Sequence, residues 1–441
     1  MKRRQFNAWA LASGAGVGLS ACGGGGGSAT GSEPLVLSPD GLVLQLDDIV
    51  SAAVLQPKLL QLADGSLVLQ WPILEGSQRA LRLGADGRRL GAEMSINGEI
   101  ANALSDGGFR ALSATYTGYA YTMLSDYNPD GELRATVTQA SEWGTSWVGS
   151  LPNGEFFNAS SPSVPSIYGE PGLPTAYSRT VLRRFSRDGQ RLPPEMEFDG
   201  SRGQWFQVAP DGRGGFWVLR SVVHSFGWKV LGASAESVWL ERYDSGNRLL
   251  ASTQVATAPR PTDLYASPDA RGVQLLPGPK DGTVLVRWRE GQMYYGPSPI
   301  WNEYFRWFDE QAQPLGPASA LFEAERESDR YLVAAASVKA GGEVDVYVVN
   351  RVDRVAEYSR RQLLPTGGFA SPAEVLFTQA SGYYFRRSDP VVQQSWPDGS
   401  AVLAYWDEIV AATSYTPGTY AQRMRRFASN GSPLRWLPEA R

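Results

Sequence analysis

The sequence predicts an all-β fold, a seven-bladed β-propeller of four-stranded antiparallel blades, and three observations lead to this expectation. The 441 residues include 48 Gly and 29 Pro and are 11% aromatic, a mixture that favours turn-rich β structure over helical bundles. With 42% hydrophobic and 20% charged residues, the chain has the balance of a protein that buries a core. The other two observations are repeated turn patterns.

The first pattern is an apolar strand, a tight turn that contains Gly, and a second apolar strand. Its clearest copies are residues 62–69 and 396–403. Related turns lie at 64–65, 106–107, 153–154, 211–212, 281–282, 341–342 and 398–399. These turns follow one another at a mean interval of about 56 residues, which is the length that a four-stranded blade needs. We therefore expect seven structural repeats.

The second pattern places an Arg and an aromatic or aliphatic residue just before another tight turn, as at 184–189. Comparable turns lie at 86–87, 130–131, 245–246, 310 and 430–431. The sixth repeat lacks a clear copy, and its candidates are Asp353 and the pair Gly367-Gly368. Two hairpins per repeat give four strands, and Asn-Gly or Asp-Gly turns suit the strand twist because both residues accept positive φ at low cost.

A ring of such repeats protects nearly all strand edges, whereas a flat sheet of so many strands is implausible. We therefore expect residues 34–441 to form a single propeller domain. Six or eight blades, two β-sandwich domains and a β-solenoid are the alternatives.

The pattern Arg-aromatic-x-x-Asp-Gly, seen at 184–189, resembles bacterial propeller repeats of about sixty residues, loosely those called delta repeats. The resemblance covers most of residues 34–441 and reflects hairpin physics as much as descent. It implies the propeller fold and no particular activity.

Two further elements are expected. Residues 34–47 contain an apolar hairpin around Asp40-Gly41, and we expect it to add to the last blade near residues 423–437, because propellers commonly build one blade from both chain ends. Residues 320–340 are the best helix candidate, although 331–338 are more typical of a strand.

Residues 1–21 have the order of an export signal, a cationic start followed by a weakly apolar stretch at 8–19. That stretch is too short for a membrane-spanning helix. The run Leu-Ser-Ala-Cys at 19–22 resembles the lipobox of bacterial lipoproteins, which implies that Cys22 becomes the acylated N-terminus after cleavage.

The signal also carries Arg3, Arg4 and Phe6, which resemble the core of a twin-arginine signal and imply export of a folded domain. Residues 22–33 are then the lipidated Cys and a Gly-rich tether. Gly23 stands where Asp would retain a lipoprotein in the inner membrane, so the resemblance implies a lipid anchor in the outer membrane of a bacterial cell envelope, facing the periplasm.

Removing the signal removes three of the 41 Lys and Arg residues and leaves all 45 Asp and Glu. The mature chain is therefore acidic, and we expect no nucleic-acid partner. Its membrane contact is the acyl chain on Cys22.

Strand alternation in a propeller predicts that the long connections gather on one face of the ring. These are residues 158–178, 221–237, 290–303, 370–389 and 407–422, which are rich in Tyr, Ser, Gly and Pro. Such a composition is typical of a binding surface. The candidate ligand contacts are Tyr168, Tyr177, Trp228, Tyr294, Tyr295, Trp301, Tyr383, Tyr384 and Tyr415. We interpret the protein as a binding or scaffold module for a protein, peptide or glycan.

The chain has one His and one Cys, which excludes a disulfide framework and a His/Cys zinc cage. A Ser-His-Asp triad would have to use His224, and no Gly-x-Ser-x-Gly motif occurs. We therefore predict no catalytic residue, no metal site and no cofactor. The alternative is a periplasmic carbohydrate-active or lyase-type enzyme with carboxylates, Tyr and Arg in the central funnel. Acidic residues from three or more blades at the mouth of the central channel would favour that alternative, whereas an apolar or plugged channel would favour the binding module.

Overall fold

The regular structure that the computed structural model describes is entirely β-strand. The described residues are 36–50, 58–72, 78–117, 119–140, 145–160, 180–198, 206–222, 237–257, 266–292, 300–323, 326–327, 331–352, 355–370, 372–380, 392–395, 399–410 and 419–436. Within them, no helix has the length and apolar character that a membrane crossing requires.

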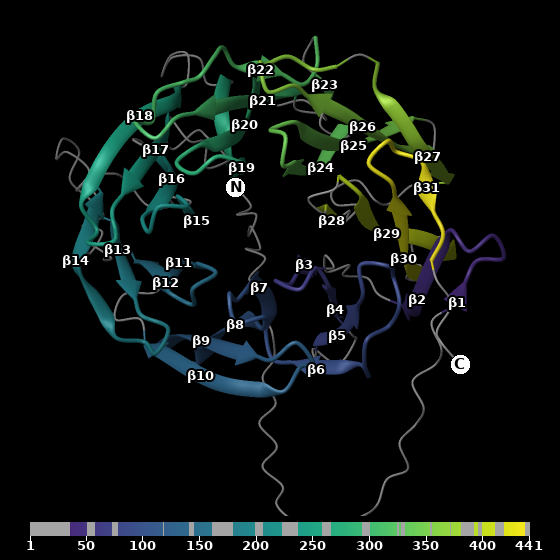
Figure 1. The fold of residues 1–441 in the computed structure, drawn as a ribbon, viewed down its shortest axis with the longest axis horizontal. Helices are drawn as coiled ribbons and strands as arrows, with labels where there is room; N and C mark the ends of the chain where they lie inside the picture. Colours follow the sequence, from purple (N-terminus) through teal and green to yellow (C-terminus); the bar gives the residue numbers. More distant parts are fainter. Residues whose placement is uncertain are drawn as a thin grey trace, which may run out of the picture. The chain divides into compact units, whose positions relative to one another are not determined.

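Seven antiparallel sheets form a ring within residues Leu35–Arg441 (Figure 1). Each sheet is one blade, and in six of the seven sheets the strands run in chain order from the centre of the ring to the outside, whereas in blade 7 β2 and β1 follow β30. The seven-bladed propeller predicted from the turn spacing is therefore confirmed, and the sandwich and solenoid alternatives are excluded.

The first four blades contain the strands from β3 to β18. Blade 1 consists of β3 (Lys58–Gln61), β4 (Leu67–Pro72), β5 (Gln78–Leu83) and β6 (Met94–Ile96). Blade 2 consists of β7 (Glu99–Ala103), β8 (Phe109–Thr117), β9 (Tyr119–Tyr127) and β10 (Leu133–Ala140). Blade 3 consists of β11 (Thr145–Ser150), β12 (Phe156–Ser160), β13 (Thr180–Phe185) and β14 (Arg191–Phe198). Blade 4 consists of β15 (Phe206–Pro210), β16 (Phe216–Val222), β17 (Ser237–Tyr243) and β18 (Leu249–Thr257).

The remaining strands form three blades. Blade 5 consists of β19 (Ala266–Pro277), β20 (Val284–Gln292), β21 (Ile300–Phe308) and the short outer strands β22 (Ser319–Ala320) and β23 (Arg326–Glu327). Blade 6 consists of β24 (Tyr331–Val338), β25 (Val344–Val352), β26 (Val355–Leu363) and β27 (Glu374–Ala380). Blade 7 consists of β28 (Val392–Ser395), β29 (Ala401–Val410), β30 (Thr419–Phe427), β31 (Pro433–Leu434), β1 (Val36–Leu37) and β2 (Val43–Val50).

Both predicted turn patterns occur at fixed places in the blades. The first pattern joins the first and second strands of every blade, and each copy has a Gly at positive φ: Gly65, Gly107, Gly154, Gly212, Gly282, Gly342 and Gly399. The second pattern joins the third strand to the outer strand. In the sixth repeat that turn is formed by Gly367 and Gly368, whereas Asp353 lies outside the described residues.

Two of these third turns reach positive φ without glycine. Asn247 takes φ 63° in blade 4 and Ala312 takes φ 56° in blade 5. The sequence pattern pointed to residues 245–246 and 310, so it found both turns and missed the residue that takes the left-handed conformation. The strand expected at 331–338 is confirmed as β24, and no helix occurs among the described residues of 320–340.

Both chain ends complete blade 7, as the sequence predicted for the first hairpin. β2 pairs antiparallel with β30, with Val43 opposite Arg425, and β31 pairs with the end of the same strand. Figure 1 shows the purple strands β1 and β2 beside the yellow end of the chain. Trp436 reinforces this closure, because its backbone N–H donates to the Gly41 carbonyl and its indole Nε1–H donates to the Met424 carbonyl.

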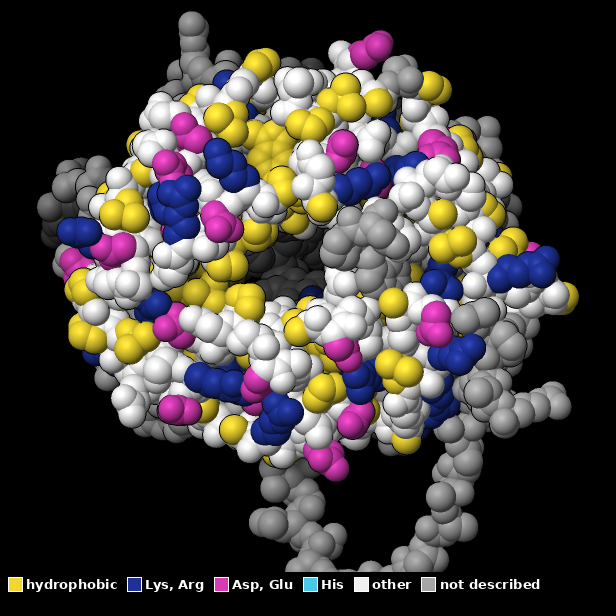
Figure 2. Space-filling model, viewed as in Figure 1, with side chains coloured by type: hydrophobic (Ala, Val, Ile, Leu, Met, Phe, Trp, Pro, Cys, Tyr) yellow, Lys and Arg dark blue, Asp and Glu magenta, His cyan; other side chains and the backbone are white. Residues whose placement is uncertain are grey.

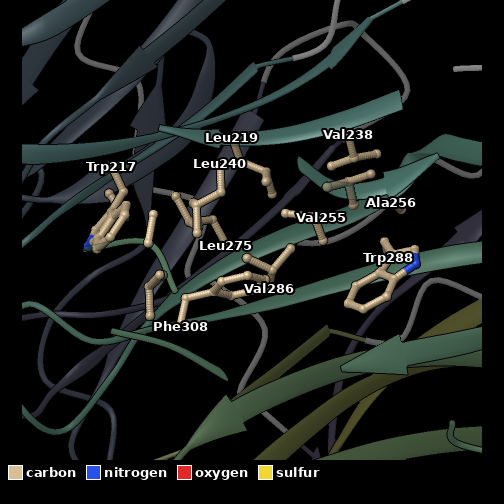
Figure 3. Packing of buried hydrophobic residues seen from close by; sticks show 14 residues of the cluster. Trp217, Leu219, Val238, Leu240, Val255, Ala256, Leu275, Val286, Trp288 and Phe308 are labelled. Atoms are coloured by element: carbon tan, nitrogen blue, oxygen red, sulfur yellow. The ribbon is translucent and has the colours of Figure 1, made fainter. Parts of the chain in front are cut away.

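The hydrophobic core is divided into layers between neighbouring blades. The described residues form seven buried clusters, one at each of the seven junctions around the ring. Figure 3 shows the layer between blades 4 and 5, where Trp217 and Leu240 of blade 4 meet Val286 and Phe308 of blade 5. Each blade is therefore buried on both faces, and the ring depends on every junction.

Candidate functional site

The two ends of the blades differ in how the chain connects their strands. In a four-stranded antiparallel meander the first and third turns lie at one end, which we call the turn face. The second connection and the link to the next blade lie at the other end, which we call the loop face. On the turn face the first turns are short, as at residues 62–66 between β3 and β4. The strand ends on the loop face are joined by much longer stretches, including 161–179 and 223–236.

Arginines of the third strands fasten neighbouring blades at the turn face. Arg242 of β17 donates from Nη2 to Asp211 Oδ2 at 2.8 Å and from Nη1 to the carbonyl of Glu310, in the third turn of blade 5, at 2.9 Å. Arg184 of β13 makes the equivalent bond to the Ser245 carbonyl in blade 4 at 2.7 Å. The Arg in the repeated sequence pattern is therefore an inter-blade clamp.

Three more junctions have a clamp of the same kind. Arg82 reaches the carboxylate of Asp130 at 2.8 Å. The carbonyls that accept the other two clamps are Ser429, bonded to Arg360 at 2.7 Å, and Asp86, bonded to Arg426 at 2.5 Å. Five of the seven junctions are thus clamped by a third-strand Arg in the described residues.

The junction between blades 2 and 3 has the opposite arrangement, with the carboxylate on the third strand of blade 2 and the Arg on blade 3. Here the third strand carries Asp126, 2% exposed, which accepts from Arg110 Nε at 2.5 Å and from Arg187 Nε at 2.9 Å. Arg187 also binds Asp106 in the first turn of blade 2. Although burial favours the neutral acid, hydrogen bonds from Arg187 and from the Gly108 N–H hold the pKa of Asp106 below its ordinary value. Asp126 and Asp106 therefore stabilise the contact between blades 2 and 3.

The inner strands around the central channel contain few acidic residues. Among the described inner strands, only β7 and β19 include a carboxylate, Glu99 and Asp269. Glu99 lies 3.5 Å from the Nζ of Lys58 on the neighbouring blade. Figure 2 shows hydrophobic side chains along the upper and left parts of the rim of the central hollow. In the described inner strands the acidic residues thus come from two blades.

A buried charge cluster occupies the half of blade 5 nearest the loop face. Glu303 is 3% exposed and accepts from Arg287 Nε at 3.0 Å and from Arg289 Nε at 2.7 Å. Burial alone would favour the neutral acid, but the two guanidinium groups outweigh it and keep the pKa of Glu303 below its ordinary value. Arg287 also donates to the Val333 carbonyl of blade 6, so this cluster stiffens the junction beneath the loop face.

The opposite face of the same hairpin carries Glu290, a carboxyl for which the described part of the chain shows no ion pair. Glu290 Oε1 accepts from the indole N–H of Trp288 at 2.6 Å, and Trp288 stacks on Tyr304 with ring centroids 5.7 Å apart. Burial raises the pKa of Glu290 despite this hydrogen bond. A carboxyl of this kind can donate a hydrogen bond or a proton to a ligand.

The predicted ligand contacts lie almost entirely outside the described residues. This holds for Tyr168, Tyr177, Trp228, Tyr294, Tyr295, Tyr383, Tyr384 and Tyr415. Trp301 belongs to β21, where it pairs with Gly291 of β20 and Arg326 of β23. Trp301 is thus the second residue of the strand that carries Glu303 two residues later. Cys22, Arg3, Arg4, Phe6 and His224 also lie outside the described residues.

Residues 287–290 were not among the predicted site residues, although their pattern indicates a buried ion pair. Two arginines alternate with apolar residues in a strand that neighbouring blades cover on both faces, and a buried guanidinium requires a carboxylate partner. That requirement predicts an acidic residue on the adjacent strand, the place where Glu303 is found. Among the described residues no group of three or more His, Cys, Asp or Glu side chains is arranged to hold a metal ion.

Comparison with known proteins shows distant likeness only. The sequence matches no family model and no curated protein. The polysaccharide lyase Uly1 aligns at 8% identity over 86% of this chain and 91% of its own, with a TM-score of 0.44. The α-L-arabinofuranosidase Arb93A from Fusarium graminearum aligns at 9% identity over 86% and 97%, with a TM-score of 0.39. Hydrazine synthase from Kuenenia stuttgartiensis aligns at 10% identity over 70% and 78%, with a TM-score of 0.41. No activity is carried over from likenesses this low.

Proposed function

We propose that this protein is a lipid-anchored scaffold of the bacterial cell envelope whose loop face binds a protein, peptide or glycan. The acyl chain on Cys22 holds the propeller at the outer membrane on the periplasmic side, through the tether at 22–33. The loop face presents the ligand contacts, and the turn face keeps the ring rigid.

The unequal lengths of the connections on the two faces support this proposal. The longest connections between described strands, 161–179, 223–236 and 381–391, all join strand ends at the loop face. The turn face is instead cross-linked by arginine clamps such as Arg242 to Glu310. A rigid ring that carries long connections on one face pre-organises a binding surface, because the scaffold and not the ligand fixes where each loop begins and ends.

Loop exchange tests the proposal directly. The variant replaces residues 223–236 and 381–391 with short Gly-Ser linkers, and the matched control inserts Gly-Ser in the first turn of blade 6, between 340 and 341. Each protein is used to capture ligands from an envelope extract, followed by mass spectrometry and glycan analysis. We expect the loop variant to lose the ligand that the wild type captures and the turn variant to keep it. The reverse pattern would overturn the proposal.

One observation favours an enzymatic alternative, a carbohydrate-active or lyase-type reaction at the loop face. Burial raises the pKa of Glu290, whose carboxyl accepts a hydrogen bond from the Trp288 indole, and a raised pKa suits a general acid. The test is the release of reducing or unsaturated sugar ends from a polysaccharide panel by the wild type and by Glu290→Gln. Activity lost in Glu290→Gln, with an unchanged thermal midpoint, would favour the enzyme. No release by the wild type leaves the scaffold function as the better account.

A further inference from the structure

The chain contains three Asn-Gly pairs, at residues 97–98, 153–154 and 430–431. Such pairs can lose ammonia spontaneously, because Gly has no side chain to hinder attack of its backbone nitrogen on the Asn side-chain carbonyl carbon. The Asn is exposed in all three pairs. The first two pairs also share the tripeptide Asn-Gly-Glu, so a difference between them in the folded protein comes from the surrounding structure.

Two of the pairs lie in tight turns that hold both reacting groups. The Gly154 N–H donates to the Leu151 carbonyl at 3.0 Å, and the Asn153 side-chain Oδ1 accepts from the Glu155 N–H at 3.0 Å. The pair at 430–431 makes the same two hydrogen bonds, at 2.8 Å and 3.0 Å. At both places the backbone nitrogen and the side-chain carbonyl must leave their partners before they can react with each other.

The pair at 97–98 is held differently. It forms the whole link between β6 of blade 1 and β7 of blade 2. The Asn97 N–H donates to the Tyr127 hydroxyl at 3.1 Å, and the Gly98 carbonyl accepts from Gln70 Nε2 at 2.7 Å. Within the described part of the chain, the Asn97 side chain and the Gly98 N–H make no hydrogen bond. The backbone is anchored on both sides, and the two reacting groups are left unengaged.

We propose that Asn97 is a site of spontaneous deamidation and that the folded structure protects Asn153 and Asn430. The Gly98 backbone nitrogen loses its proton and forms a bond to Asn97 Cγ, and the bond from Cγ to Nδ2 breaks with release of ammonia. Water then opens the succinimide ring at one of its two carbonyls, which leaves either aspartate or isoaspartate at this position. This inference does not depend on the proposed function.

The modification changes the link between the first two blades. It adds a negative charge directly before Glu99, and isoaspartate also adds one carbon to the main chain. Gln70 is 1% exposed, and its side chain bonds both the Gly98 carbonyl and the Ile100 N–H, the latter at 2.8 Å. A longer main chain moves Gly98 away from this side chain, and a buried amide that loses a partner costs stability. We therefore expect the isoaspartate form to unfold at a lower temperature.

Peptide mapping by mass spectrometry tests the inference on the full chain, incubated folded at mildly alkaline pH. We expect Asn97 to deamidate at least about tenfold faster than Asn153 and Asn430, because two hydrogen bonds must first break at each of those sites. The matched control is the same chain unfolded in urea, where the turn hydrogen bonds are absent and the three rates should converge. Labelling by an isoaspartate methyltransferase identifies the isoaspartate product.

A variant supplies the second readout. Asn97→Ser removes the reactive amide, and its thermal midpoint is expected to stay constant during incubation while that of the wild type falls. Gly98→Ala is unsuitable, because Gly98 has φ 97° and an added Cβ would lie 2.4 Å from the Leu112 carbonyl oxygen. Equal rates at the three sites in the folded chain, a slower rate at Asn97, or rates that stay apart in urea would each overturn the inference.

Discussion

Glu303 lies in the layer between blades 5 and 6, where its carboxylate faces the guanidinium groups of Arg287 and Arg289. The side chains of all three residues are at most 20% exposed. Removing one member of a buried charge cluster leaves the others without compensation in a medium of low polarity. Single residues of this kind set local stability in the ring.

Glu303→Gln is expected to lower the free energy of unfolding by about 3 kcal/mol or more, because the buried Arg287 and the half-buried Arg289 lose the carboxylate that pairs with both. Since the pKa of Glu303 is lowered in the folded protein, its contribution is present above its ordinary value of 4.5 and is lost as the pH falls through the folded pKa. Urea unfolding at several pH values measures both effects. The control is Glu99→Gln, at a side chain 63% exposed, with an expected change of at most about 0.5 kcal/mol.

Asp345 behaves in the opposite sense. It is fully buried, and burial raises its pKa even though Lys339 Nζ lies 2.9 Å away. Its ionised form therefore costs stability as the pH rises from the ordinary value of 3.8 through the folded pKa. We expect the wild type to gain stability relative to Asp345→Asn as the pH falls. At Asp244, a hydrogen bond from the Arg248 N–H lowers the pKa of the carboxyl. We therefore expect the wild type to lose stability relative to Asp244→Asn as the pH falls. The stability difference between wild type and each variant is measured by urea unfolding at several pH values. The same pH dependence for Asp345→Asn and Asp244→Asn would contradict this account.

At the scale of single elements, the third strands explain the repeated Arg of the sequence. Each clamping Arg uses its planar fork twice, once within its own blade and once on the next blade, as Arg242 does with Asp211 and Glu310. A lysine has one donor centre and cannot reproduce this geometry. The motif therefore records contact between blades, and not the tight turn that follows it.

Arg242→Lys is expected to lower the free energy of unfolding by about 1–3 kcal/mol, because Asp211, 1% exposed at its side chain, loses a bidentate partner. Equilibrium urea unfolding checks this value. Arg248→Lys is the matched control, since Arg248 is 78% exposed at its side chain and is expected to change stability very little. An equal effect of the two substitutions would show that the clamp does not stabilise the ring.

At the scale of the whole molecule, the ring is closed by the two ends of the chain. Leu44 of β2 and Trp436 are both 3% exposed and belong to the buried layer between blades 7 and 1. β2 and β31 pair with different parts of β30. The first and last described residues therefore stabilise the same junction, and opening it exposes a core layer.

Deletion of residues 36–50 is expected to lower the thermal midpoint sharply or to prevent folding, because β30 loses its outer neighbour and Leu44 leaves the core. Calorimetry of the full chain and the deletion variant measures the difference. Deletion of 23–32 in the predicted tether is the control and should leave the midpoint unchanged. A midpoint that survives the loss of β1 and β2 would mean that β31 and Trp436 close the ring without them.

The sequence by itself determined the all-β class, the seven repeats, the first turn of every blade, the third turn of every blade except the sixth, and the joining of residues 34–47 to the last blade. These features depend on local chemistry, on Gly and Asn at positive φ and on apolar alternation, which short stretches of sequence carry. Only the tertiary structure decided what the repeated arginines bind and that Glu303 is the carboxylate that pairs with Arg287 and Arg289. Those features depend on which side chains of neighbouring strands and neighbouring blades meet, and no single short stretch of sequence specifies both partners.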